Sequence, residues 1–295
     1  MLLDAAEMLQ SAGHEISFIH TVEGENYYGA DIEDFAALAR RAGARFSIGG
    51  RLADHQPAMT TSGTDVAISV NWPRLIRSQL LTAFPFGILN AHAGDLPRYR
   101  GNACPNWAIL NFERRVGVTV HRMVEEVDAG PVLVKAFLEI DETTYVGDIY
   151  NWLETIVPSL FVHGISQLGT QRLTPQDPSV RPLRTFPRRA EDSRIEWKRT
   201  TRDVLSLVRA SSRPFPGAFT FLEGKEKINI LRARPYDPDY DFLAMPGQVC
   251  LRSSAGNPVV ATGDGMIELE ECASADRDDL TTRTLLARSL RARLS

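Results

Sequence analysis

The fold is decided by the stretch of sequence that reads Gly87-Ile88-Leu89-Asn90-Ala91-His92-Ala93-Gly94-Asp95-Leu96-Pro97-Arg98-Tyr99-Arg100-Gly101. Its opening apolar residues predict a short buried strand, and the remainder predicts a loop. Asn90 and His92 lie two residues apart at the end of this strand, so extended geometry sends both side chains to one face. Ligands bind at the carboxyl ends of strands in open α/β sheets, which places the pair for chemistry. Taken alone, it also fits a structural histidine held by a hydrogen bond.

Helical and extended patterns alternate on both sides of this stretch. Upstream, the apolar spacing predicts helices that end at Gly13 and Gly43 and, between and after them, strands over 15–20 and 65–70. Alternation of this kind is typical of an α/β domain. The remaining expected elements are a helix over 76–82, a helix over 105–111, strands over 116–124 and 132–140, and a long amphipathic helix over 149–168.

The start of the chain departs from the usual order of an α/β domain. It begins on a helix, whereas a helix in such a domain follows a strand that supplies the sheet. We therefore expect a first strand to be absent, either because the start is misassigned or because the chain is truncated. A true truncation would expose a sheet position, weaken folding and invite edge pairing.

A polar segment over 169–189 with four prolines predicts an ordered, non-helical linker between two domains. We place the boundary so that the first domain covers 1–178 and the second covers 179–295. Beyond the linker, Thr201 is expected to cap a helix, and a charged tail carries leucines at helical spacing. Five short strand patterns predict a small open β-barrel, and they lie at 218–222, 228–233, 247–251, 259–262 and 266–270.

Composition narrows the class of protein. The 33 Lys and Arg against 37 Asp and Glu give a net charge of −4, so bulk charge does not indicate a broad phosphate-binding surface. Cys104, Cys250 and Cys272 form no CxxC pair, which favours a reducing compartment over a zinc site or a disulfide framework. We expect a cytoplasmic protein from this cysteine usage, because no signal peptide is evident either. No stretch has the roughly 20 apolar residues that a membrane helix needs.

Ordered motifs run through both expected domains. The first domain contains Asn90-x-His92, Leu96-Pro97-x-Tyr99-Arg100-Gly101, Pro105-x-Trp107-Ala108-Ile109, Gly117-Val118-Thr119-Val120 and Val127-Asp128-Ala129-Gly130-Pro131. The second contains Arg188-Arg189, Asp192, Ile195-Glu196-Trp197, Val208-Arg209-Ala210, Pro214-Phe215-Pro216-Gly217-Ala218-Phe219 and Val260-Ala261-Thr262-Gly263-Asp264-Gly265. Together they resemble the folate-dependent formyltransferase family, which includes methionyl-tRNA formyltransferase. The resemblance covers roughly 3–272 and is closest in appearance to the sugar N-formyltransferase branch.

The resemblance implies transfer of a formyl group from N10-formyltetrahydrofolate to an amine. It implies a Rossmann-like domain with a mostly parallel sheet, followed by a small open β-barrel of the OB kind, and no metal. Position by position, it makes Asn90 the donor to the developing oxyanion, His92 the proton acceptor and Asp128 the carboxylate that orients His92 or holds a water. In isolation, Asp128 before Gly130 also fits an ordinary turn.

The resemblance also points to two segments for the folate donor. Backbone groups of Arg74, Leu75 and Ile76 and the loop over 123–128, with Val124, Glu125 and Val127, are expected to read the edges of the pterin. Leu75 and Ile76 fit helix core equally well. The other histidines, His14, His20, His55, His121 and His163, are interpreted as structural or surface residues, and Trp107 as core.

Three classes of formyl acceptor fit the motifs. The favoured one is the amino group of a nucleotide-linked amino sugar, and the others are methionyl-tRNA and a small amine or hydroxylamine metabolite. Where relatives read His-x-Ser-Leu-Leu-Pro, this chain has Gly94 and Asp95, so the acceptor side can differ. Arg98, Tyr99 and Arg100 fit either a solvated turn or substrate contact. The resemblance to the sugar-modifying branch also implies a homodimer.

Two other classes of protein are weighed against this one. A degenerate, non-catalytic binding module would explain an absent strand, but it has no need for Asn90, His92 and Asp128 together. A nicotinamide-binding enzyme is disfavoured because no G-x-G-x-x-G follows an early strand.

Overall fold

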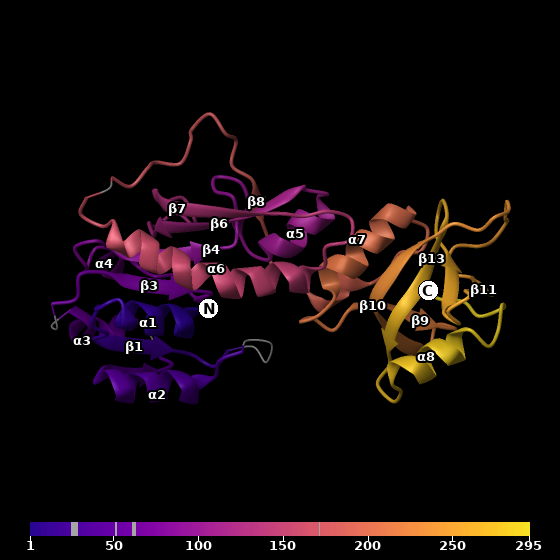
Figure 1. Cartoon of the computed structure of the whole chain (residues 1–295), viewed down its shortest axis with the longest axis horizontal. Helices are drawn as coiled ribbons and strands as arrows, with labels where there is room; N and C mark the ends of the chain where they lie inside the picture. The colour runs from indigo at the N-terminus through magenta and orange to yellow at the C-terminus, as the bar shows by residue number, and fades with distance from the viewer. Residues whose placement is uncertain (25–28, 51, 61–62, 171) are drawn as a thin grey trace. The chain divides into compact units, whose positions relative to one another are not determined.

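A computed structural model describes residues 1–24, 29–50, 52–60, 63–170 and 172–295. The chain forms two compact units (Figure 1). The first unit contains Met1–Cys104, Arg115–Glu139 and Tyr150–Phe186, and the second contains Pro105–Arg114, Ile140–Ile149 and Pro187–Ser295.

Helices and strands alternate through the first part of the chain, which confirms the α/β prediction. Local signals explain their ends: Asp31 caps a helix by accepting the amide of Asp34 at 3.0 Å, and Gly43 ends it in the left-handed region at φ +66°. The elements are α1 (Leu2–Ser11), β1 (Phe18–Thr21), α2 (Ile32–Ala42), β2 (Arg45–Ile48), η1 (Leu52–His55), α3 (Gln56–Thr60), β3 (Ala67–Val70), α4 (Ser78–Leu81), β4 (Ile88–His92), β5 (Arg100–Gly101), α5 (Cys104–Leu110), β6 (Arg115–Arg122), β7 (Val132–Glu139), α6 (Val146–Ser166) and β8 (Arg184–Thr185).

The first unit contains parallel and antiparallel pairs. β3, β4, β6 and β7 lie in that order in one sheet, in which β3 and β4 are parallel and the later pairs are antiparallel. β1 and β2 form a separate parallel pair. The sequence analysis did not predict β2, η1 or α3, which are four or five residues long.

A cavity of about 690 Å³ lies in the first unit, lined by residues of α1, β1, β3 and α4. Its lining is mostly apolar and includes neither Asn90 nor His92. In the described part of the chain, β1 and β3 each have a strand partner on one edge only. Ile88 of β4 lines this cavity, but none of the predicted catalytic residues Asn90, His92 and Asp128 does.

The expected linker is partly built into the first unit. Thr174 bridges to Val132, and β8 pairs in parallel with β5 through Arg100 and Arg184. The last segment of the first unit is Tyr150–Phe186. Of the linker residues, Gln171 lies outside the described part of the chain.

The second unit is built on an antiparallel sheet in the order β11, β12, β13, β10, β9. Ile195, Val208, Ile230 and Ile267 belong to its buried core. The described strands do not close into a barrel, and this confirms a separate, open β domain. Its elements are η2 (Ala190–Ser193), α7 (Thr201–Ser211), β9 (Ala218–Leu222), β10 (Glu226–Tyr236), β11 (Val249–Arg252), β12 (Pro258–Ala261), β13 (Met266–Ala273) and α8 (Asp279–Leu286).

Two details of this unit differ from the sequence prediction. The cap of α7 is Thr200, whose hydroxyl accepts the amide of Asp203 at 3.1 Å, and Thr201 is the first helical residue. The tail after α8 contacts both edges of the sheet: the Ser295 amide donates to Phe221 O at 3.0 Å, and the Leu294 amide donates to Gly247 O at 2.8 Å. Backbone pairing of this kind leaves little trace in side-chain patterns.

Gly247 tests the contribution of the tail to stability. Its φ is +85°, and a Cβ there would lie 2.1 Å from Leu294 O. Gly256 is a matched control, because its φ is also +85° but nothing lies within 4 Å of its Cβ position. We expect Gly256→Ala to lower the free energy of unfolding in urea by about 1–2 kcal/mol. Gly247→Ala should lower it by about 1–3 kcal/mol more, and equal losses would contradict a stabilising tail.

Candidate active site

Four polar side chains share one face of the β4 and β6 ladder. Asn90 lies directly opposite His121, and His92 lies opposite Thr119. Residues directly opposite in an antiparallel pair, and those two positions along, point to the same face. The ladder therefore collects an amide, two imidazoles and a hydroxyl on the face that the sequence predicted for Asn90 and His92.

His92 is held in one tautomer by its neighbours. Its Nε2 lies 2.5 Å from Tyr99 O, and since a carbonyl only accepts, Nε2 carries the proton. Its Nδ1 lies 3.6 Å from Asp128 Oδ2. The ring is 8% exposed, so these contacts replace most of its hydration. The nitrogen that is free to gain a proton is consequently Nδ1, on the side of Asp128.

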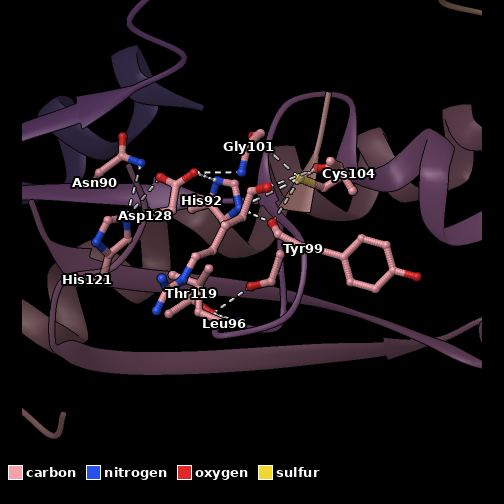
Figure 2. A network of polar contacts seen from close by, with 12 residues as sticks. Asn90, His92, Leu96, Tyr99, Gly101, Cys104, Thr119, His121 and Asp128 are labelled. Atoms are coloured by element: carbon pink, nitrogen blue, oxygen red, sulfur yellow. Dashed lines mark hydrogen bonds and ion pairs between the residues drawn. The ribbon is translucent and has the colours of Figure 1, made fainter. Parts of the chain in front are cut away.

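Asp128 contacts both imidazoles (Figure 2). Its Oδ2 also accepts the Gly101 amide at 2.8 Å, and its Oδ1 lies 3.5 Å from His121 Nε2. The residue has φ +54°, a left-handed conformation that Asp tolerates better than most residues. Asp128 is thus the carboxylate that joins the loop after β6 to the two histidines.

The charges of this group are set by its contacts. Burial alone would raise the pKa of Asp128, but the hydrogen bond with His121, the nearby His92 and the Gly101 amide outweigh it and lower the pKa. Burial alone would lower the pKa of His92, but Cys104, Asp128 and Tyr99 O outweigh it and raise the pKa. The site therefore favours an ionised carboxylate beside an imidazole that readily gains a proton.

The loop between β4 and β5 fixes the carbonyl that His92 contacts. Thr119 Oγ1 donates to Gly94 O at 2.6 Å, and Lys135 Nζ contacts Asp95 Oδ1 at 2.8 Å and also Leu96 O. A Cβ on Gly94 would lie 2.7 Å from His92 Nε2, so the loop can approach the ring only with glycine there. Gly94 and Asp95, which differ from the Ser and Leu expected for the family, therefore both have structural roles: Gly94 allows the close approach to His92, and Asp95 binds Lys135.

A second network holds the backbone of the Asp128 loop. Arg100 donates to Gln176 Oε1 through Nε at 3.2 Å and Nη2 at 2.7 Å, and to Glu126 Oε1 through Nη1 at 3.0 Å. Gln176 Nε2 in turn donates to Asp128 O at 2.7 Å and Gly130 O at 2.9 Å. The sequence analysis did not decide whether Arg98, Tyr99 and Arg100 form a solvated turn or contact substrate. In the structure, the Arg100 side chain binds Gln176 and Glu126, and the Tyr99 carbonyl contacts His92.

A buried thiol also borders His92. Cys104 Sγ lies 3.1 Å from Tyr99 O and 3.7 Å from His92 Nε2, and it contacts Thr185 Oγ1 at 3.3 Å. It is 3% exposed. Cys104 thus packs on the side of the imidazole opposite to Asp128.

The two segments predicted to bind folate lie side by side. Ile76 and Met123 pack against the same apolar cluster, and the Ser78 hydroxyl contacts the Glu125 carboxylate. Leu75 is 81% exposed, which argues against its reading as helix core. Arg74 donates to Gly50 O at 2.6 Å, and Val124 and Val127 are each 38% exposed. Each segment therefore has exposed apolar side chains: Leu75 in the first, and Val124 and Val127 in the loop that ends at Asp128.

Sequence reasoning missed His121 and Gln176. His121 was interpreted as a structural or surface residue because it matched no partner in the motifs. Its spacing from Thr119, two residues along a predicted strand, was a signal that both side chains share a face. Gln176 lies in a proline-rich segment without any period, and no pattern marks it. Among the described residues, no group of three His, Cys, Asp or Glu could hold a metal ion, and no helix is long and apolar enough to cross a membrane.

Comparison with known proteins identifies the family. The formyl transferase family model matches residues 42–165, and the model of the formyl transferase C-terminal domain matches residues 188–290. Together they cover more than half of the chain, which therefore belongs to the formyl transferase family. This confirms the resemblance that the motifs around Asn90, His92 and Asp128 indicated.

Solved structures share the fold at low sequence identity. HypX from Aquifex aeolicus, in complex with tetrahydrofolic acid, is 21% identical with a TM-score of 0.63 over 90% of this chain and 45% of HypX. WlaRD, a sugar 3N-formyl transferase, is 15% identical with a TM-score of 0.63 over 93% of this chain and 94% of WlaRD. Methionyl-tRNA formyltransferase from Clostridium thermocellum is 14% identical with a TM-score of 0.52 over 74% and 93%. The chain thus spans less than half the length of HypX.

Gln176 offers a test of the network behind the Asp128 loop. In Gln176→Leu, the carbonyls of Asp128 and Gly130 lose their donor and Arg100 loses an acceptor. We expect the free energy of unfolding in urea to fall by about 1–3 kcal/mol. Gln10→Leu, at an exposed position of α1 in the same unit, is the matched control and should change it by less than about 0.5 kcal/mol. Similar values for the two variants would show that the network does not stabilise the unit.

Proposed function

We propose that the protein is an N-formyltransferase that moves a formyl group from N10-formyltetrahydrofolate to a primary amine. The observation that carries this proposal is the convergence of the Asn90 amide, the His92 imidazole and the Asp128 carboxylate at the end of β4. The family gives the reaction class, and these three side chains supply the groups that formyl transfer needs.

Asn90 stabilises the charge that develops on the formyl oxygen. As the amine nitrogen bonds to the formyl carbon, negative charge collects on that oxygen, and a fixed donor is required there. Asn90 lies on β4 with its Nδ2 near the buried His121, so the position of its amide is set before substrate binds. The bond between the formyl carbon and N10 then breaks, which gives the N-formyl product and tetrahydrofolate.

His92 takes the proton that the attacking amine must lose. Its Nε2 is occupied by Tyr99 O, so the proton goes to Nδ1, where Asp128 Oδ2 stabilises the resulting imidazolium. The proton then passes to the departing folate nitrogen, which leaves His92 neutral again. Asp128 remains ionised throughout, consistent with its lowered pKa.

The two loop segments fit the flat, polar-edged pterin of the donor. Leu75, Val124 and Val127 can cover its faces, while backbone groups of both segments meet its edges. Two related structures support this donor, since HypX was solved in complex with tetrahydrofolic acid and WlaRD in the presence of 5-N-formyl-THF. The donor supplies the activated formyl group, and the protein supplies position, charge and proton transfer.

The acceptor that we favour is the amino group of a nucleotide-linked amino sugar. In support, this chain matches WlaRD, described as a sugar 3N-formyl transferase, over nearly the full length of both proteins. Methionyl-tRNA is the second candidate, but a net charge of −4 does not favour the phosphate contacts that dominate tRNA affinity. The free thiols of Cys104, Cys250 and Cys272 support a cytoplasmic setting for either reaction.

The function is tested with purified protein, N10-formyltetrahydrofolate and a panel of acceptors. Release of tetrahydrofolate is followed with nucleotide-linked amino sugars, methionyl-tRNA and small hydroxylamines. We expect turnover with a sugar nucleotide, and a loss of roughly 10²–10³-fold in kcat for Asn90→Ala and His92→Ala, because each removes a group used only in the transition state. Turnover with methionyl-tRNA and with no other acceptor would show that tRNA, and not a sugar nucleotide, is the acceptor. Wild-type rates in Asn90→Ala or His92→Ala would refute the mechanism.

The pH dependence tests the pairing of Asp128 with His92. His92 accepts a proton only when it is neutral, so kcat/KM should rise with pH through its raised pKa. Asp128→Asn removes the negative charge beside Nδ1, which lowers the pKa of His92. We expect its rising limb at lower pH than in the wild type, with a lower plateau. Asp65→Asn, at an exposed position of the same unit, should leave the limb in place, and an unmoved limb in Asp128→Asn would contradict the pairing.

A further inference from the structure

Three hydrogen-bond donors form a row across the strands β4, β6 and β7. Thr119 lies directly opposite His92 on one side and directly opposite Lys135 on the other. Residues that are directly opposite in a sheet point to the same face, so the three side chains stand in line under the loop that joins β4 to β5. Each donates to a different carbonyl of that loop, and the pairs are His92 Nε2 with Tyr99 O at 2.5 Å, Thr119 Oγ1 with Gly94 O at 2.6 Å, and Lys135 Nζ with Leu96 O.

Thr119 is the middle donor of this row, and its side chain is 0% exposed. Its hydroxyl donates to Gly94 O and accepts the Leu96 amide at 3.4 Å (Figure 2). Asp95, between these two residues, packs on Gly117 of β6, where a Cβ would lie 2.9 Å from Asp95 Cβ. One side chain of β6 thus fixes the loop backbone on both sides of Asp95.

The part of the loop that Thr119 anchors also touches the His92 ring. A Cβ on Gly94 would lie 2.7 Å from His92 Nε2 and 2.5 Å from Tyr99 O, so Gly94 packs against both atoms of that hydrogen bond. The loop then turns, with the Arg98 amide donating to Asp95 O at 2.9 Å, and reaches Tyr99. A shift of the anchored residues therefore moves Tyr99 O relative to the ring.

We propose that Thr119 is a positioning residue that holds Tyr99 O on Nε2 of His92 and thereby keeps the proton of the neutral ring on Nε2. The proposal rests on the proposed function, because this tautomer matters for the reaction only if Nδ1 takes the proton of the amine. With Tyr99 O displaced, the ring proton is free to move to Nδ1, where the Asp128 carboxylate accepts it. Nδ1 then has no lone pair for the amine proton. Thr119 itself does not touch the reacting atoms.

Two substitutions separate the hydroxyl of Thr119 from its shape. Thr119→Val keeps the volume and removes the hydroxyl, whereas Thr119→Ser keeps the hydroxyl. We expect Thr119→Val to lower kcat by roughly 10- to 100-fold, because misplacement of a catalytic group by about 1 Å can cost roughly 10²-fold in rate. The KM for N10-formyltetrahydrofolate should stay within about twofold, and Thr119→Ser should keep kcat within about threefold of the wild type.

Thr220 is the matched control, because its hydroxyl has the same two roles in the second unit. It is a residue of β9 that is 0% exposed, and it accepts Trp197 Nε1 at 2.9 Å and donates to Ser295 O at 3.3 Å. Thr220→Val should reduce stability to urea about as much as Thr119→Val does, but leave kcat within about twofold. Equal losses of kcat in the two valine variants, or equal losses in Thr119→Val and Thr119→Ser, would contradict the proposal.

The tautomer of His92 can be measured without any acceptor. Nitrogen NMR shifts of the neutral ring, assigned by comparison with His92→Ala, distinguish a proton on Nε2 from one on Nδ1. We expect Nε2 to carry the proton in the wild type and in Thr119→Ser, and Nδ1 to carry it in a large share of Thr119→Val molecules. The wild-type tautomer in Thr119→Val would overturn the proposal, whatever its kinetics.

A double-mutant cycle tests whether Thr119 acts through His92. In a His92→Ala background, Thr119→Val should lower the residual kcat by less than about threefold. A full, additive loss in that background would show that Thr119 acts elsewhere. Absence of formyl transfer by the wild-type protein with every acceptor would instead count against the proposed function, and the NMR measurement would still decide whether Thr119 sets the tautomer.

Discussion

The site depends on one carboxylate that must stay ionised while it is largely removed from water. Burial alone would favour protonation of Asp128, and the structure offsets this with the Gly101 amide and two imidazoles. Each of these partners makes its own demand on the chain. Gly101 has φ +115°, and a Cβ there would lie 2.1 Å from Thr185 O, so only glycine brings that amide to the carboxylate while β5 pairs with β8. The glycine at position 101 is thus needed to keep the Asp128 carboxylate hydrogen-bonded in its ionised form.

His92 and His121 contact the Asp128 carboxylate through different ring nitrogens. His92 has its Nε2 fixed by a backbone carbonyl and its Nδ1 turned to Asp128, so it can gain a proton where the carboxylate stabilises it. His121 is fixed in the opposite sense, with its Nδ1 on a carbonyl and its Nε2 toward the site. Glycines pass close to both carbonyls, Gly94 to Tyr99 O and Gly130 to Arg122 O. The Asp128 carboxylate therefore faces Nδ1 of one ring and Nε2 of the other.

Much of this was predictable from the sequence, and the remainder was not, for identifiable reasons. Strand alternation predicted that Asn90 and His92 share a face, and the resemblance to the family supplied their expected roles. Their pairing with β6 was not, because register depends on partners distant in the chain, and so His121 looked like an ordinary core residue. β8 is two residues long and Gln176 lies among prolines, so neither shows a period. The backbone pairing of residues 292–295 leaves no side-chain pattern either, which is why the tail was expected to be only a charged helix.

The Gln176 and β8 contacts also bear on how the protein is made. The backbone of Asp128 is held by a side chain 48 residues further along the chain, and Gly101 is paired with a strand more than 80 residues away. During synthesis, the strands of the first unit and α6 are made before Gln176 and β8 are added. A nascent chain that ended shortly after α6 would have β4 and β6 in place but no support for the Asp128 loop. The support of the Asp128 loop is therefore completed only when the segment after α6 has been built onto the first unit.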